Sequence, residues 1–129
     1  MKNNNKIFLG EFIASCFLVM VIVGSGIMAE NLTNDNAVRL LANTIATGAG
    51  LFVLITAFAN ISGAHLNPFV SLSMYLTKRI KGKELLTFIP AQILGCLLGV
   101  MLAIVFFEHC IIDLSTKILS FNPSVDPNS

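Results

Sequence analysis

The sequence predicts an all-α membrane protein with three transmembrane helices and one re-entrant half-helix. Hydrophobic residues make up 55% of the chain and charged residues only 12%, whereas a soluble domain carries about a quarter charged residues. Three long stretches contain no charged residue: 12–29, 40–59 and 85–107. Because about 20 apolar residues cross the hydrocarbon core of a bilayer, each stretch is long enough for one span. A fourth apolar stretch, from Phe69 to Thr77, is too short to cross.

We place the three spans at about residues 7–29, 38–59 and 85–107. A cleaved signal peptide is the alternative for the first span, because MKNNNK is basic and the stretch ends in small residues. Against this, its apolar part is longer than a signal core of about 7 to 15 residues, and it contains Glu11 near its start. We therefore treat the first stretch as a span.

The basic residues predict how the chain is oriented in the cell's inner or plasma membrane. Six of them flank one side, two before the first span and four in the KRIKGK loop, whereas the other side has only Arg39 and Lys117. Cytoplasmic segments carry the excess of Lys and Arg, so the N-terminus is expected inside and the C-terminus outside. This topology requires the segment 61–77 to enter and leave from the cytoplasmic side.

The sequence of segment 61–77 indicates how it does so. Non-helical backbone is tolerated at membrane depth only where protein covers it or where it lines a watery cavity. Asn67 followed by Pro68 is a good helix start, because Asn caps free N–H groups and Pro fits the first helical position. A helix over 68–77 is about 15 Å long and reaches roughly the middle of the bilayer. Its positive dipole end would repel cations and offer donors to neutral or anionic solutes.

Three stretches carry a family resemblance: GEFIASCFLVMVIVGSG, SGAHLNPFVS and FIPAQILGCLLG, in this order. Together they resemble the aquaporin and glycerol-facilitator family, the major intrinsic proteins. The resemblance implies that residues 1–107 are the first of two inverted repeats of a channel for water or small neutral solutes such as glycerol. It also implies that the half-helices of the two repeats meet at the pore centre, and that the channel assembles in the bilayer as a homo-oligomer, usually a tetramer.

The resemblance also assigns roles to particular residues. Gly63, Ala64 and His65 would line the pore with their backbone carbonyls, and Asn67 would donate its amide to a passing solute. The alternative for His65 is a side chain tucked into the loop that only holds its shape. Glu11 would brace the re-entrant loop by accepting backbone N–H groups, or it would simply sit at the membrane interface.

Two positions depart from the family's common pattern. Thr47 stands where an aromatic ring usually narrows the outer constriction, so a wider filter that favours glycerol-like or metalloid hydroxide solutes is expected. Thr47 as an ordinary packing residue is the alternative. Phe69 replaces the alanine that follows Pro68 in the usual motif, which would alter the closure of the pore centre.

Enzymatic chemistry is not expected from this sequence. The membrane region offers no nucleophile paired with a base, and Cys16 and Cys96 lie inside apolar spans without the spacing of metal ligands. We therefore expect no catalytic residues, no metal, no cofactor and no nucleic-acid partner. Gln92 is expected to hydrogen-bond inside the helix bundle.

The second repeat, with its own Asn-Pro motif, is absent from these 129 residues. The sequence therefore suggests a truncated channel or one that needs a complementary second half. The alternative function is a non-conducting three-pass membrane protein, either a remnant or an interaction subunit. Residues 108–129 are expected to form a polar C-terminal tail that is disordered or loosely bound to the surface.

Overall fold

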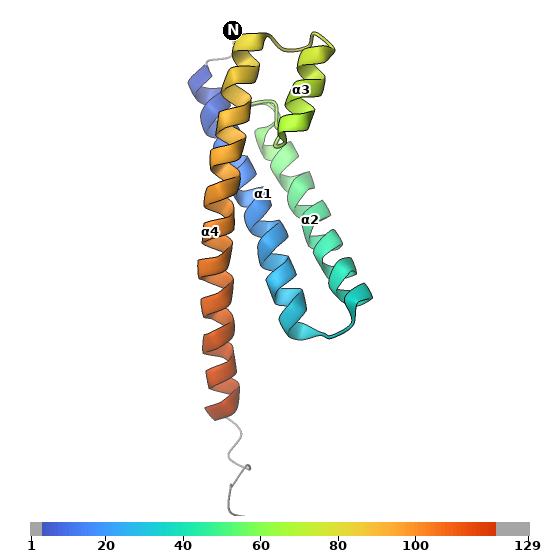
Figure 1. The fold of residues 1–129 in the computed structure, drawn as a ribbon, viewed down its shortest axis with the longest axis vertical. Helices are drawn as coiled ribbons and strands as arrows, with labels where there is room; N and C mark the ends of the chain where they lie inside the picture. The colour runs from blue at the N-terminus through green and yellow to red at the C-terminus, as the bar shows by residue number, and fades with distance from the viewer. Residues whose placement is uncertain (1–3, 121–129) are drawn as a thin grey trace, which may run out of the picture.

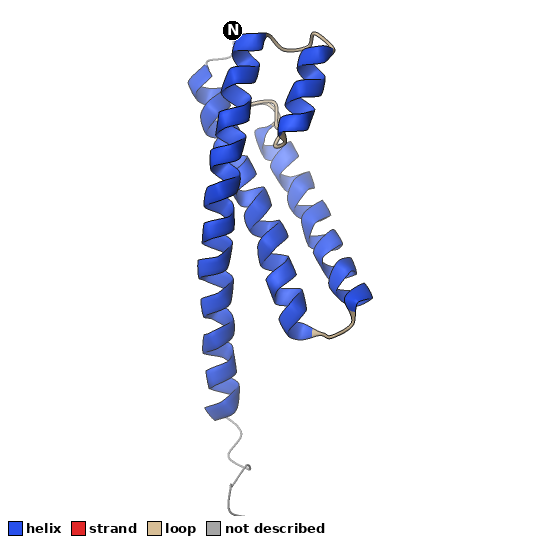
Figure 2. Cartoon of the chain, in the orientation of Figure 1, coloured by secondary structure: helices blue, strands red, loops and turns tan. Residues whose placement is uncertain are grey.

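The structure, a computed structural model, describes residues 4–120, with side chains described up to residue 107. Four helices make up this part of the chain: α1 (Asn4–Leu32), α2 (Asn36–Phe58), α3 (Pro68–Leu76) and α4 (Gly82–Ser120). Within the described residues all regular structure is helical (Figure 2). The prediction of an all-α membrane fold with three spans and one half-helix is therefore confirmed.

The helices are arranged around α1, which packs against both α2 and α4, while α3 packs against α4 (Figure 1). Helices α1 and α2 and the part of α4 over 82–107 are each long and apolar enough to cross a membrane. Helix α3 has nine residues and is about 14 Å long, so it cannot cross. The start of α1 and the turn between α3 and α4 lie at one end of the bundle, and the α1–α2 linker lies at the other.

Two glycines let α1 and α4 approach until their backbones touch. A Cβ atom at Gly95 would collide with the carbonyl oxygen of Phe12, and one at Gly99 with that of Cys16. This spacing of small residues four apart brings helices together in membranes, where the hydrophobic effect does not drive them to associate. At these two positions the α1–α4 contact is thus made by backbone.

Polar contacts hold the α1–α2 linker, which lies at the end of the bundle opposite the α3–α4 turn. Asp35 caps α2 by accepting the N–H of Ala37 at 2.8 Å. The Arg39 guanidinium donates to the carbonyls of Thr33 at 2.7 Å and Glu30 at 3.1 Å. Because the last carbonyls of a helix have no partners within it, Arg39 closes the C-terminal end of α1 and fixes where α2 begins.

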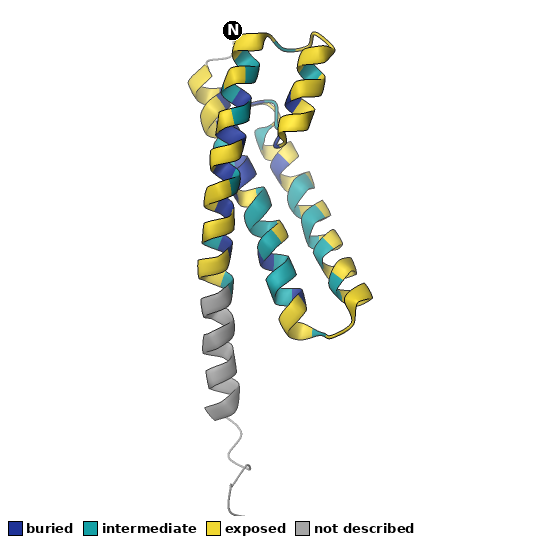
Figure 3. Cartoon of the chain, viewed as in Figure 1, coloured by how far each residue is buried: buried dark blue, intermediate teal, exposed yellow. Residues whose placement is uncertain are grey.

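Few positions of the chain are buried (Figure 3), and a high proportion of the buried side chains are polar. Ala14, Leu54 and Leu66 form an apolar cluster where α1, α2 and the loop meet. Five polar side chains are completely buried: Glu11, Ser15, Ser62, Ser71 and Gln92. Most large apolar side chains instead point outward, as expected for a protein whose solvent is lipid.

Helix α4 continues to Ser120, so residues 108–120 of the expected tail are helical. The physical reason is visible in the sequence, since no Gly or Pro occurs between Gly99 and Pro123 to end the helix. The turn-forming prolines that suggested a flexible tail belong to residues 121–129, which lie outside the described part of the chain.

Candidate functional site

The candidate site is the loop that joins the end of α2 to the start of α3. Three of its residues have left-handed backbone conformations: Gly63 with φ of 115°, Ala64 with φ of 49° and Leu66 with φ of 55°. Glycine adopts this conformation freely, but for Ala and Leu it is strained. Residues held in strained conformations persist only where the surrounding structure holds them in place.

Glu11 provides that support from the interior of α1. Its buried carboxylate accepts four hydrogen bonds. Oε1 takes the hydroxyl of Ser62 at 2.7 Å and the backbone N–H of His65 at 3.0 Å. Oε2 takes the backbone N–H of Leu66 at 2.8 Å and the side-chain amide of Gln92 at 2.9 Å. One carboxylate thus joins α1, α4 and three positions of the loop.

A second layer of contacts connects this carboxylate to α3. The Gln92 amide also donates to the hydroxyl of Ser71, at 2.9 Å, and Nδ1 of His65 lies 3.0 Å from the same hydroxyl. The His65 ring stacks on Phe88 of α4, with ring centroids 4.2 Å apart. The half-buried His65 side chain therefore lies against protein, between α3 and α4.

The hydrogen bonds of the loop also determine where its carbonyls point. In a trans peptide the N–H and the preceding C=O point in opposite directions, and no described peptide bond is cis. The N–H groups of His65 and Leu66 point at Glu11, so the carbonyls of Ala64 and His65 point away from it. The N–H of Ala64 points at the Ser62 hydroxyl, so the Gly63 carbonyl also points away from this cluster. Three successive carbonyls therefore face away from the buried support.

Asn67 lies at the end of this row of carbonyls and caps α3. Its Oδ1 accepts the N–H of Phe69 at 2.8 Å, and Pro68 occupies the first turn of the helix. The Asn67 side chain is exposed, and its Nδ2 amide has no hydrogen-bond partner among the described residues. Phe69 is 74% exposed, so its ring lies outside the four-helix cluster. The N-terminus of α3 thus presents amide donors to the space beside the loop.

Thr47 is placed apart from this cluster, on α2. It lies one turn before Leu51 and two turns before Leu54, on the face of α2 that packs against the loop. Its hydroxyl is buried and has no hydrogen-bond partner in the described chain. The structure therefore gathers Glu11 and the residues 63–67 into one site and leaves Thr47 further along α2.

Sequence reasoning did not select Ser62, Ser71 or Phe88 as parts of this site. A serine inside an apolar half-helix is a weak signal that was available for Ser71, because a buried hydroxyl needs a partner. Phe88 carries no signal of its own, since it is one apolar residue in an apolar span. Gln92 does hydrogen-bond inside the bundle, as expected.

These features define the class of protein: a multi-pass membrane protein with a polar loop and half-helix supported inside its helices. The model of the major intrinsic protein family matches residues 1–126, and the chain belongs to this family. It is 44% identical over 110 residues to Aquaglyceroporin AqpS of Rhizobium meliloti (strain 1021), covering 85% of this chain and 47% of that protein. It is 37% identical over 94 residues to Aquaporin A of Dictyostelium discoideum, covering 73% of this chain and 34% of that protein.

A third relative is Aquaporin-4 of Rattus norvegicus, 31% identical over 94 residues, covering 73% of this chain and 29% of that protein. The chain therefore spans less than half the length of each of these three relatives. The relatives are named as aquaporins and an aquaglyceroporin, which is consistent with the expectation that this chain is not an enzyme.

Proposed function

We propose that this chain forms one half of a membrane channel for the passive transport of water or small neutral solutes such as glycerol. The observation that carries the proposal is the row of Gly63, Ala64 and His65 carbonyls, which faces away from Glu11 and ends at the Asn67 amide. Carbonyl acceptors followed by an amide donor can replace the hydration of a polar solute along a narrow path. Asn67, Gly63, Ala64 and His65 are therefore the proposed pore-lining residues, and Glu11 holds them in position.

The α3 helix supports selection for neutral solutes. Its N-terminus carries a partial positive charge because the first N–H groups of a helix lack intrahelical partners. A cation that reaches Asn67 would meet this charge, whereas a neutral hydroxyl would find donors and acceptors side by side. Thr47 would leave the outer mouth wide, which supports glycerol-like solutes, and the relative named an aquaglyceroporin agrees with that class.

A complementary half is needed because the loop is covered on only one side. Asn67, Pro68 and Phe69 are exposed, and Leu54 is the only buried residue on α2 within the described chain. Polar backbone at membrane depth must be covered by protein or face a water-filled path. We propose that a second, inverted half provides the opposing wall, and that the completed channel assembles as a tetramer.

The proposed orientation places the start of α1 and the α3–α4 turn in the cytoplasm. Lys6 lies at this end, together with Lys78, Arg79, Lys81 and Lys83, whereas Arg39 lies at the opposite end. Cytoplasmic segments carry the excess of basic residues, so the end with five described basic residues is the inner one.

Flux measurements test the proposed function. The chain is reconstituted in vesicles alone and together with the second half of the Rhizobium relative, and water and glycerol permeability are measured by stopped-flow light scattering. We expect the pair to raise permeability well above that of empty vesicles, and the lone chain to leave it at the lipid background. A variant of the pair with Asn67→Ser, which keeps a side chain that can cap α3, serves as the impaired comparison.

Two outcomes would contradict the proposal. An assembled pair without flux would favour the alternative of a non-conducting three-pass membrane protein. Robust flux from the lone chain would show that it builds a pore from identical copies inserted in both orientations, with no complementary half.

A further inference from the structure

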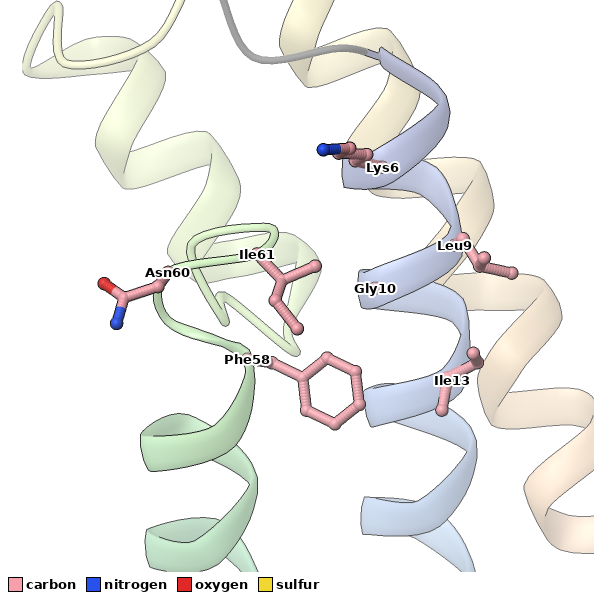
Figure 4. A pocket seen from close by; sticks show the side chains of 7 residues that line it. All are labelled: Lys6, Leu9, Gly10, Ile13, Phe58, Asn60 and Ile61. Carbon is pink, nitrogen blue, oxygen red and sulfur yellow. The ribbon is translucent and has the colours of Figure 1, made fainter.

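Two cavities lie between α1 and α2. The first has a volume of about 410 Å³ and is shown in Figure 4. Its lining includes Lys6, Gly10 and Ile13 of α1, and Phe58 and Ile61 at the end of α2. The second has a volume of about 400 Å³ and is lined only by apolar residues, among them Phe17, Val21, Ala49, Gly50 and Val53.

The two cavities lie along the same line of contact between α1 and α2. The lining residues of α1 are three or four positions apart from Lys6 to Val21, and those of α2 show the same spacing from Ala46 to Val53. Residues with this spacing share one face of a helix. From Lys6 to Val21 this face is about 22 Å long by the helical rise. We call this feature the α1–α2 groove, and it is longer than the roughly 15 Å of hydrocarbon that belongs to one leaflet.

The groove is polar at one end only. Lys6 and Asn60 carry the polar side chains among its lining residues, and both belong to the first cavity. The Asn60 amide points away from Lys6 and from the cavity (Figure 4), so the Lys6 ammonium is the polar group at this end of the groove. Figure 4 shows the Lys6 side chain extending from α1 toward the side of Asn60 and Ile61, above the apolar residues. No acidic side chain lines either cavity. The remaining basic residues of this end, in the α3–α4 turn, add to its positive charge.

We propose that the α1–α2 groove binds one anionic phospholipid. Its phosphate contacts Lys6, and one acyl chain lies along the apolar face toward Phe17 and Val21. Basic sites between helices at the cytoplasmic side are suited to acidic headgroups, and a purely apolar partner would leave Lys6 without a counter-charge.

Tryptophan fluorescence provides a direct test, because the sequence contains no tryptophan. The variant Phe17→Trp places a reporter in the groove, where Phe17 is 50% exposed. The variant Met101→Trp is the matched reporter on α4, where the residue is 66% exposed and lies at a similar depth, since Gly99 faces Cys16. Each is reconstituted in phosphatidylcholine vesicles that contain a small fraction of either phosphatidylglycerol or phosphatidylcholine with brominated acyl chains, which quench tryptophan on contact.

We expect brominated phosphatidylglycerol to associate with the Phe17→Trp site about fivefold more strongly than brominated phosphatidylcholine, the effect of one basic residue near an anionic headgroup. At Met101→Trp the two lipids should quench equally. Adding Lys6→Gln to Phe17→Trp should remove the preference, and Lys6→Arg should keep it. Equal quenching by both lipids in the groove, or a preference that survives Lys6→Gln, would overturn the proposal. Absence of quenching at Phe17→Trp alone would also overturn it, by showing that protein covers this face. None of these readouts depends on solute flux.

Discussion

The carboxylate of Glu11 and the side-chain amide of Gln92, 81 residues apart in the chain, meet at 2.9 Å in the interior of the bundle. Through this contact α1 is joined to α4 at the same depth as the loop that precedes α3. Gln92 donates onward to Ser71 of α3, so the two residues connect three helices and the loop. A change at either residue should therefore alter the loop before it alters the helices.

Glu11→Ala should release the loop while leaving the spans helical. The backbone N–H groups of His65 and Leu66 would lose their acceptor, and an unsatisfied buried donor costs about 1–3 kcal/mol. We expect the free energy of unfolding in mixed micelles to fall by about 3 kcal/mol, and amide hydrogen exchange at these two residues to accelerate. Glu30→Ala, which removes an exposed carboxylate, is the control and should change neither quantity. If His65 and Leu66 kept their protection from hydrogen exchange in Glu11→Ala, the loop would not need the carboxylate to keep its conformation.

Gly99→Ala should separate α1 from α4. The added Cβ would collide with the Cys16 carbonyl, and backbone cannot move aside as a flexible side chain does. Overpacking of this kind costs about 1–3 kcal/mol, so the variant should unfold at a lower temperature by circular dichroism in micelles. Gly48→Ala is a matched control, because nothing lies within 4 Å of a Cβ at that position. Equal stability of the two variants would contradict the backbone contact inferred between α1 and α4.

Much of the fold could be predicted from the sequence because its strongest signals are local. Span length and the Asn67–Pro68 helix start depend on a few neighbouring residues, and both describe features that the structure contains. The extent of α4 could not be predicted from the prolines near the end of the chain, since helix continuation depends on the residues before them. A turn-forming residue shows that the helix ends somewhere before it, but it does not show at which residue.

The candidate site was less accessible to sequence reasoning. Glu11 stood out because it is an acidic residue in an apolar span. Its four donors come from two distant segments of the chain, the loop and α4, and no periodicity links position 11 to Ser62, Leu66 or Gln92. Likewise, Phe88 became recognisable as a partner of His65 only when the fold brought the two rings together. Long-range pairs of this kind require the three-dimensional structure.

The proposed orientation predicts which loops are accessible from outside the cell. In a variant lacking the three native cysteines, Asn34→Cys in the α1–α2 linker should react with a membrane-impermeant maleimide in intact cells. Lys81→Cys in the α3–α4 turn should react only after the membrane is permeabilised. Both positions are exposed, so accessibility within the protein does not distinguish them. The reversed pattern would overturn both the orientation and the cytoplasmic entry of the loop.

Thr47→Phe tests the proposed outer mouth in the channel completed with a second half. If Thr47 lines the proposed outer mouth, a ring at position 47 narrows the path for a three-carbon solute more than for water, whereas a ring that packs among the residues around Leu51 and Leu54 does not. We expect glycerol permeability to fall by at least about tenfold, equivalent to about 1.4 kcal/mol added to the barrier, with a smaller loss for water. Thr47→Val is the control, because it removes the unpaired hydroxyl at nearly constant volume. Equal losses of water and glycerol in Thr47→Phe would indicate that Thr47 is a packing residue.

Asn67→Asp tests whether the N-terminus of α3 governs the charge of the solute in the same completed channel. An aspartate caps a helix as well as an asparagine, so the hydrogen bond to the Phe69 N–H and the start of α3 should be kept. The substitution replaces the Asn67 amide donors with a negative charge that offsets the positive end of the helix dipole. Water and glycerol permeability should therefore fall, while a cation conductance should appear in planar bilayers. Asn67→Ser separates the two effects, because it caps without charge and should reduce flux without admitting cations. If Asn67→Asp kept the original permeability and remained closed to cations, Asn67 would not face the path of the solute.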